Sequence, residues 1–245
     1  MRNLKVLALS ALFVSTGAFA NEGSVPEYFY QPEEGESAVE FGVGYKDLTE
    51  SSLNKDEISP RLSAMHGIMH GLALRAGVSY TYADDANGGN GFNNLDLDLV
   101  GHHGMGGMTL HYGVEGSITP TKTGSQRFGE EHVFVPYVGV SMGEHCKYGA
   151  KFSYNSFTSS GLGGVTGDDY TVSAFGEWDK EDRYLLGLAV NYDQASGADD
   201  AVTANVYGRV YMEKFTLLPR LNYTMEMDGA DEDGFGLEIA ARFMF

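Results

Sequence analysis

The final twelve residues, GFGLEIAARFMF, constrain the fold of this chain more than any other stretch. Every second residue from Phe235 to Phe245 is apolar, whereas the intervening residues include Glu238 and Arg242. A period of two places the apolar residues on one face of a β-strand and the polar residues on the other. In water such an apolar strand edge promotes aggregation. In lipid a closed barrel removes the edge, because the last strand pairs with the first. We therefore expect a β-barrel that spans a membrane.

The same alternation recurs from Ala38 onwards, in segments separated by turns. It predicts twelve strands, which makes the expected fold an all-β, twelve-stranded antiparallel transmembrane β-barrel over residues 38–245. Pro60 weakens the second strand, because proline donates no ladder hydrogen bond. Long and short connections alternate, as in barrels with long outer loops and tight periplasmic turns. The predicted strands cover residues 39–46, 58–65, 72–82, 95–99, 108–115, 134–142, 148–154, 170–178, 184–192, 202–212, 215–227 and 234–245.

Aromatic residues stand at the last position and two positions before it, as Phe245 and Phe243. This ending resembles the C-terminal signal of bacterial outer-membrane β-barrels, and we expect Phe243 and Phe245 to act as an assembly signal. The resemblance implies recognition by the barrel-assembly machinery. It also implies a location in the bacterial outer membrane, with lipid and lipopolysaccharide as partners. The alternation of long and short connections places both termini in the periplasm. Outward-facing aromatic residues at both ends of the strands fit the two membrane interfaces.

Two segments precede the predicted barrel. Residues 1–20 combine a basic start, a short apolar core and a small-x-small ending, which predicts a secretory signal peptide. Residues 21–37 are acidic, contain two prolines and show no alternation, although Tyr28, Phe29 and Tyr30 interrupt them. This N-terminal segment is expected to be periplasmic, either as a flexible tail or as a small plug that enters the barrel from below.

The net charge of the chain limits the functions that it can have. The chain has 34 acidic and 16 basic residues, and removal of the leader with its two basic residues leaves 14 − 34 = −20. This acidity excludes nucleic acid as a partner. The single cysteine, Cys146, cannot form an internal disulfide.

The inward-facing residues are the candidates for function. Many of them are small, such as Gly77, Gly113 and Gly187, and small side chains favour an open lumen in a barrel of intermediate size. Bases gather on the first three and the last three predicted strands, which become neighbours on closure and also carry Glu40 and Glu238. Asp96, Asp98 and Glu115 lie on the fourth and fifth strands, so we expect a field across the pore that selects solutes. The alternative is that acids and bases pair along the wall. The predicted pore-lining residues are Arg61, Arg75, Arg209, Arg220, Arg242, Lys46, Glu40, Glu238, Asp96, Asp98 and Glu115.

Other constellations carry weaker signals. Histidines near the short turns are more simply solvated interface residues than metal ligands, and the acidic pairs of the long loops are more simply a solvated rim than a Ca²⁺ or Mg²⁺ site. Twelve-stranded outer-membrane phospholipases carry a His-x-Ser pair, and this chain has none. We therefore expect no catalytic residues, no metal and no cofactor. The histidines weighed are His66, His70, His102, His103 and His111.

The resemblance to small porins implies passive diffusion of small polar or charged solutes. The alternative is a structural barrel that assembles into homo-oligomeric rings, with lipid inside them. Small outward residues would permit close contact between barrels, namely Ala64, Ala204, Gly208 and Ala241.

Overall fold

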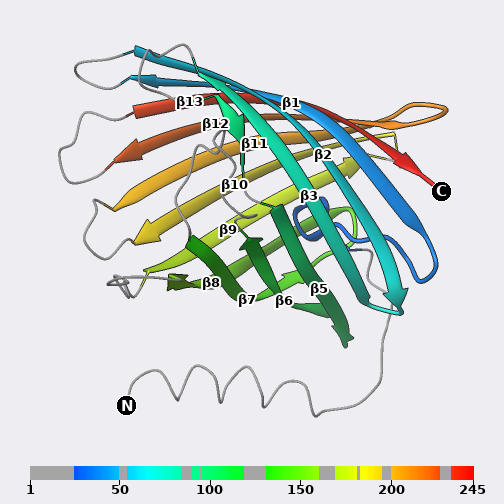
Figure 1. Cartoon of the computed structure of the whole chain (residues 1–245). Helices are drawn as coiled ribbons and strands as arrows, with labels where there is room; N and C mark the ends of the chain where they lie inside the picture. The colour runs from blue at the N-terminus through cyan, green and yellow to red at the C-terminus, as the bar shows by residue number, and fades with distance from the viewer. Residues whose placement is uncertain are drawn as a thin grey trace, which may run out of the picture.

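Twelve antiparallel strands form a closed barrel in the computed structural model (Figure 1). The structure describes residues 25–49, 54–83, 90–93, 95–118, 131–159, 169–180, 183–194, 200–226 and 233–245. The barrel strands are β1 (Ser37–Thr49), β2 (Asn54–Met69), β3 (Leu72–Ala83), β5 (Leu95–Met105), β6 (Met108–Ile118), β7 (Glu131–Met142), β8 (Cys146–Ser159), β9 (Asp169–Lys180), β10 (Tyr184–Gln194), β11 (Ala201–Tyr211), β12 (Thr216–Glu226) and β13 (Asp233–Met244). A two-residue strand, β4 (Gly91–Phe92), pairs with β3 in the connection to β5.

The closing strand behaves as its alternation predicts. β13 pairs with β12 on one side and with β1 on the other, from Ala38 opposite Met244 to Thr49 opposite Asp233. Beyond the last strand residue, the N–H of Phe245 donates to the carbonyl of Ser37, and the N–H of Ser37 donates back. Each strand therefore has a partner on both sides, as lipid requires.

The strands present an apolar outer face. On β10, Leu186, Leu188 and Val190 are about half exposed, whereas the intervening Leu185 and Ala189 are buried. The same alternation continues around the barrel, so the outward phase forms an apolar belt suited to lipid. Among the described residues, the structure contains no helix with the length and apolar character needed to cross a membrane.

Tight turns join the strands at one end, which we call the short-turn end, and longer connections join them at the long-loop end. The β5–β6 turn consists of Gly106 and Gly107, both with positive φ. Two consecutive residues with positive φ suit the right-handed twist of a hairpin, and glycine adopts them without strain. The first long connection is shorter than expected, because β1 and β2 extend to Thr49 and from Asn54.

Pro60 does not end the second strand, which runs from Asn54 to Met69. Pro60 lies opposite Val43 in the ladder with β1, but the ladder with β3 has no pair at Ser59 or Pro60. The missing N–H thus falls on one side only. The hydroxyls of Ser59 and Thr81 lie 2.9 Å apart across this interruption and join the two strands there.

The N-terminal segment lies inside the barrel. Residues 25–36 include one 3₁₀ turn, η1 (Glu27–Phe29), which is surrounded by strands (Figure 1). The segment is held at the short-turn end of the barrel, where the N–H of Gly35 donates to the carbonyl of Gly67 at 2.9 Å. A Cβ at Gly67 would collide with the backbone of Glu33, so glycine permits this close approach. The described part of the segment is therefore a plug and not a free tail.

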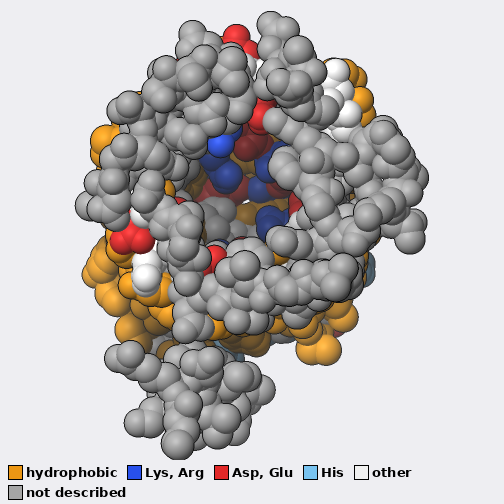
Figure 2. Space-filling view, turned by 60° about the vertical axis from the view of Figure 1, so that its left-hand side comes forward, with side chains coloured by type: hydrophobic (Ala, Val, Ile, Leu, Met, Phe, Trp, Pro, Cys, Tyr) orange, Lys and Arg blue, Asp and Glu red, His pale blue; other side chains and the backbone are white. Residues whose placement is uncertain are grey.

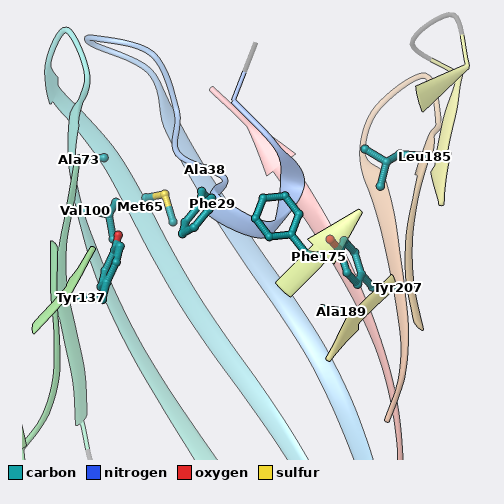
Figure 3. Packing of buried hydrophobic residues seen from close by; sticks show 10 residues of the cluster. All are labelled: Phe29, Ala38, Met65, Ala73, Val100, Tyr137, Phe175, Leu185, Ala189 and Tyr207. Carbon is teal, nitrogen blue, oxygen red and sulfur yellow. The ribbon is translucent and has the colours of Figure 1, made fainter. Parts of the chain in front are cut away.

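Aromatic rings fill the lumen beside the plug. The ring of Phe29 stacks on His111 with 3.9 Å between centroids, and the ring of Tyr28 stacks on Phe175 at 4.6 Å. Figure 3 shows Phe29 between Tyr137 and Phe175.

Inward-facing glycines leave room for aromatic rings from the neighbouring strand. Gly187 lies opposite Tyr207 and Gly113 lies opposite Tyr137 in the ladders, and in both pairs the ring covers the glycine. Aromatic side chains that cover glycines on a neighbouring strand are a known way to stabilise sheets. The inference that small inward residues favour an open lumen was therefore wrong at these positions.

Gly187→Ala tests this packing. The new Cβ would collide with the ring of Tyr207, so overpacking should lower the free energy of unfolding by about 1–3 kcal/mol. Gly176→Ala is the matched control, since Gly176 is on the adjacent strand and a Cβ there meets no atom within 4 Å. Urea titration in lipid vesicles measures both variants. Equal stability of the two variants would contradict the packing described here.

Candidate functional site

The lumen contains a cavity of about 530 Å³ between the plug and the long-loop end. Residues 27–30 of the plug line it, together with residues of β1–β3, β5–β8 and β11–β13. Figure 2 looks into the barrel and shows Lys, Arg, Asp and Glu side chains gathered in the hollow, with hydrophobic side chains around the outer surface. Charged groups and an internal cavity thus occur together.

Nine of the eleven predicted pore-lining residues line this cavity. They are Arg61, Arg75, Arg220, Arg242, Glu40, Glu238, Asp96, Asp98 and Glu115. Arg209 is instead buried beside the plug, and Lys46 is exposed and lies outside the lining. Strand alternation predicts the inner face for these residues. The N-terminal segment covers Arg209, whereas Lys46 lies toward the long-loop end of β1.

Most of these charges pair with neighbours along the wall. Arg61 Nη2 lies 2.5 Å from Glu238 Oε1, and Arg242 Nε lies 2.5 Å from Glu40 Oε1. Because the partners lie on adjacent or nearby strands, these acids and bases pair along the wall, as in the alternative expectation. They do not face each other across the lumen. The cavity lining has five bases and six acids: Arg61, Arg75, Lys151, Arg220 and Arg242, against Glu27, Glu40, Asp96, Asp98, Glu115 and Glu238.

Arg75 and Arg220 differ sharply in their surroundings. Arg75 Nε donates to Asp98 Oδ2 at 2.5 Å, and the Asp98 side chain is only 4 % exposed. Asp98 also accepts the backbone N–H of Gly116 at 3.1 Å. Arg220 is exposed toward the cavity, and within the described part of the chain no carboxylate forms an ion pair with it. Arg220 is therefore available to a solute, whereas Arg75 neutralises a buried acid.

A cluster of buried charges fastens the plug to the wall. The carboxylate of Glu27 accepts Arg242 Nη2 at 2.6 Å and Arg209 Nη1 at 3.2 Å. Its side chain is only 8 % exposed. Arg209 also binds Asp179 at 2.8 Å, and Arg242 binds Glu40, so each guanidinium has one carboxylate from the wall and shares Glu27 as a second.

The backbone of the plug is held as well. The N–H groups of Glu27 and Tyr28 donate to the carboxylate of Glu177 at 3.0 and 2.7 Å, and the hydroxyl of Tyr207 donates to the same carboxylate. The ring of Tyr30 lies 3.4 Å from the guanidinium carbon of Arg242, a cation–π contact. Burial raises the pKa of Tyr30 to about 12, so its hydroxyl stays protonated at neutral pH.

Sequence reasoning missed the residues that fasten the plug. Glu27 resembled the other acids of its segment, although it directly precedes the only aromatic triplet there. A second signal was the presence of aromatic residues on the inward phase of strands, each opposite or beside a glycine. The missed residues are Glu27, Tyr28, Tyr30, Phe175, Glu177, Asp179 and Tyr207.

The five histidines that the sequence singled out lie toward the short-turn end. His111 Nε2 and Ser141 Oγ are 2.7 Å apart, a base–hydroxyl contact that sequence spacing did not reveal. Both residues are buried and the ring of Phe29 covers His111, so the contact supports packing against the plug. Within the described residues, no three His, Cys, Asp or Glu side chains are grouped so that they could hold a metal ion.

Several predicted features stay predictions. The expected leader, residues 21–24 and most of the acidic pairs in the long loops lie outside the described residues. Phe243 and Phe245 are at the short-turn end, where Phe245 is 78 % exposed, and their role as an assembly signal stays a prediction. Ala64, Ala204, Gly208 and Ala241 belong to the outward phase of their strands, and contact between barrels through them stays a prediction.

Glu27→Gln tests the attachment of the plug. Loss of the charge weakens bonds to Arg209 and Arg242, and hydrogen bonds to charged groups contribute about 1.5–3 kcal/mol each. We expect the amides of Tyr28 and Phe29 to exchange with solvent at least about tenfold faster in the variant, since 1.4 kcal/mol corresponds to tenfold. Hydrogen exchange of the folded barrel measures this. Glu33→Gln, an exposed acid of the same segment, is the control and should leave exchange unchanged.

Comparisons with known proteins agree on the fold. No protein-family model matches the sequence, and no curated protein is similar to it in sequence. Among solved structures, an outer-membrane channel from Pseudomonas putida F1 has a TM-score of 0.65 at 14 % identity, over 91 % of this chain and 100 % of its own. The NanC porin has a TM-score of 0.60 at 10 % identity, over 83 % and 98 %. The KdgM porin, solved in complex with disordered oligogalacturonate, has a TM-score of 0.55 at 11 % identity, over 83 % and 99 %. The chain therefore has the fold of the small outer-membrane β-barrels.

Proposed function

We propose that this protein is an outer-membrane channel through which small polar or charged solutes diffuse passively. The observation that carries the proposal is the cavity of about 530 Å³, lined by charged side chains and enclosed by a lipid-compatible barrel. A structural barrel without a transport role needs no such cavity. The fold shared with a channel and two porins supports the same proposal.

The charges of the cavity favour modest ion selectivity. Five bases and six acids line it, and most of them are paired, so the net field on a passing ion is small. Paired charges still offer hydrogen-bond donors and acceptors to a polar solute that loses part of its water shell. The channel therefore accepts polar solutes of either charge, and Arg220 gives a local preference for anions.

The plug sets the resting conductance. Tyr28, Phe29 and Tyr30 fill the lumen together with Phe175 and Tyr207 at the short-turn end. A solute that crosses the barrel has to pass this plug or move it. We therefore propose that the channel rests in a narrow state.

Arg220→Ser and Arg75→Ser form a matched pair that tests conduction through the cavity. Arg220 has no ion-pair partner among the described residues, so its removal should shift the reversal potential toward cations, most visibly at low salt, with unchanged stability. Removal of Arg75 leaves Asp98 buried and unpaired, so it should mainly lower the unfolding temperature. Planar bilayers and thermal unfolding measure both variants. An Arg220→Ser channel with unchanged selectivity at low salt would contradict conduction past this residue.

The orientation of the barrel is part of the proposal. We expect the short-turn end to face the periplasm, so native Cys146, exposed in the β7–β8 turn region, should not react with an impermeant maleimide on intact cells. In a Cys146→Ser background, a cysteine introduced at Asn87 should react. Permeabilised cells give the control, because Cys146 should then react. The reverse pattern on intact cells would contradict this orientation.

A further inference from the structure

The wall beneath the plug has the properties of a binding site that exists without the plug. Arg209 is held by Asp179 at 2.8 Å and Arg242 by Glu40, both residues of the barrel wall. Tyr207 is held by Glu177 at 2.8 Å and rests on Gly187. Because wall residues fix these three side chains, their positions do not depend on Glu27. Preorganised groups of this kind bind a ligand at low entropic cost.

The chemistry of this wall is that of a receptor for a carboxylate. Two guanidinium groups converge on the carboxylate of Glu27 through three N–H groups. Charge-assisted bonds from arginine to a carboxylate are the stronger class of hydrogen bond. With the plug in place both arginines are buried, since the side chains of Arg242 and Arg209 are 6 % and 11 % exposed.

An aromatic slot adjoins the carboxylate site. The ring of Phe175 is parallel to that of Tyr28, with an interplanar angle of 5°, and the ring of Tyr207 lies 6.4 Å from Tyr28. A flat ring placed on Phe175, with Tyr207 tilted by 46° beside it, gains stacking energy that a saturated ring does not. The plug therefore supplies a carboxylate and an adjacent aromatic ring, and the wall accommodates both.

The site is accessible from the cavity. Glu27, Tyr28, Arg242 and Tyr207 all line it, so a solute in the cavity meets the groups that hold the plug. A cavity of about 530 Å³ is within the range that accommodates small ligands. A solute has to compete with a tethered segment and therefore needs a high concentration, because a short tether raises the local concentration of the segment to about the millimolar range.

We propose that Arg209, Arg242, Phe175 and Tyr207 form a binding site for small aromatic carboxylates, which residues 27–28 occupy in the resting protein. An aromatic carboxylate that enters the cavity takes the place of Glu27 and Tyr28 and displaces the plug. The same solute class thus binds the site and widens its own path. This inference rests on the proposed channel function for its consequence, but binding itself does not require conduction.

Phenylacetate is the probe, and the purified full chain in detergent is the sample. We expect millimolar phenylacetate to speed hydrogen exchange at Tyr28 and Phe29 and to give a saturable binding heat. Cyclohexylacetate keeps the charge and loses the flat ring, and 2-phenylethanol keeps the ring and loses the charge. Both should require at least about tenfold higher concentration, in line with loss of one charged or stacking contact.

Glu27→Gln sharpens the experiment, because it weakens the competing segment and leaves the wall intact. Phenylacetate should act on this variant at about a tenfold lower concentration than on the native chain, whereas Glu33→Gln should behave as the native chain does. Heat-modifiable migration confirms that each barrel is folded. Absence of binding to both the native chain and Glu27→Gln would overturn the inference, as would equal binding of cyclohexylacetate and phenylacetate.

A bilayer measurement separates the two proposals. Binding without any conductance would leave the binding site standing and defeat the channel function. Conductance that phenylacetate does not alter, in a protein that does not bind it, would defeat the binding site and leave the channel standing.

Discussion

Closure of the sheet is the constraint on which the rest of this structure depends. Lipid offers no partner to a free backbone N–H or carbonyl, so twelve strands are stable there only because β13 pairs with β1. Closure separates two environments along every strand. Outward residues face lipid and become apolar, and inward residues face a confined lumen in which polar and charged groups must find partners.

In the lumen, charged side chains find partners by pairing with their neighbours on the wall. Four carboxylates and three guanidinium groups form one connected network from Asp179 through Glu27 to Glu238. A buried charge without a partner costs several kcal/mol, so each arginine of this network contacts more than one acid. Glu27 is the only member that comes from outside the strands. The network therefore couples the N-terminal segment to the wall, and this coupling makes the plug part of the functional site.

The alternation of the sequence predicted the parts of the molecule that periodicity controls. It predicted twelve strands, their antiparallel closure and the inward phase of Arg61, Arg75 and Glu238, because a period of two is independent of tertiary detail. It left the plug as one of two alternatives, since residues 25–36 have no period and are held by contacts with residues far away in the sequence, such as Glu177. It also could not distinguish a glycine that leaves open space in the lumen, such as Gly77, from a glycine that an aromatic ring covers, such as Gly187.

Single-channel conductance of a variant that lacks residues 25–31 tests the central claim, namely that a charge-fastened plug narrows a channel lined by the cavity. The barrel of this variant keeps all twelve strands and the wall pairs of Arg209 with Asp179 and Arg242 with Glu40. We expect a folded, heat-modifiable barrel whose conductance is several times that of the full chain, because the lumen widens with removal of the plug. A folded variant with the same conductance as the full chain would contradict the claim.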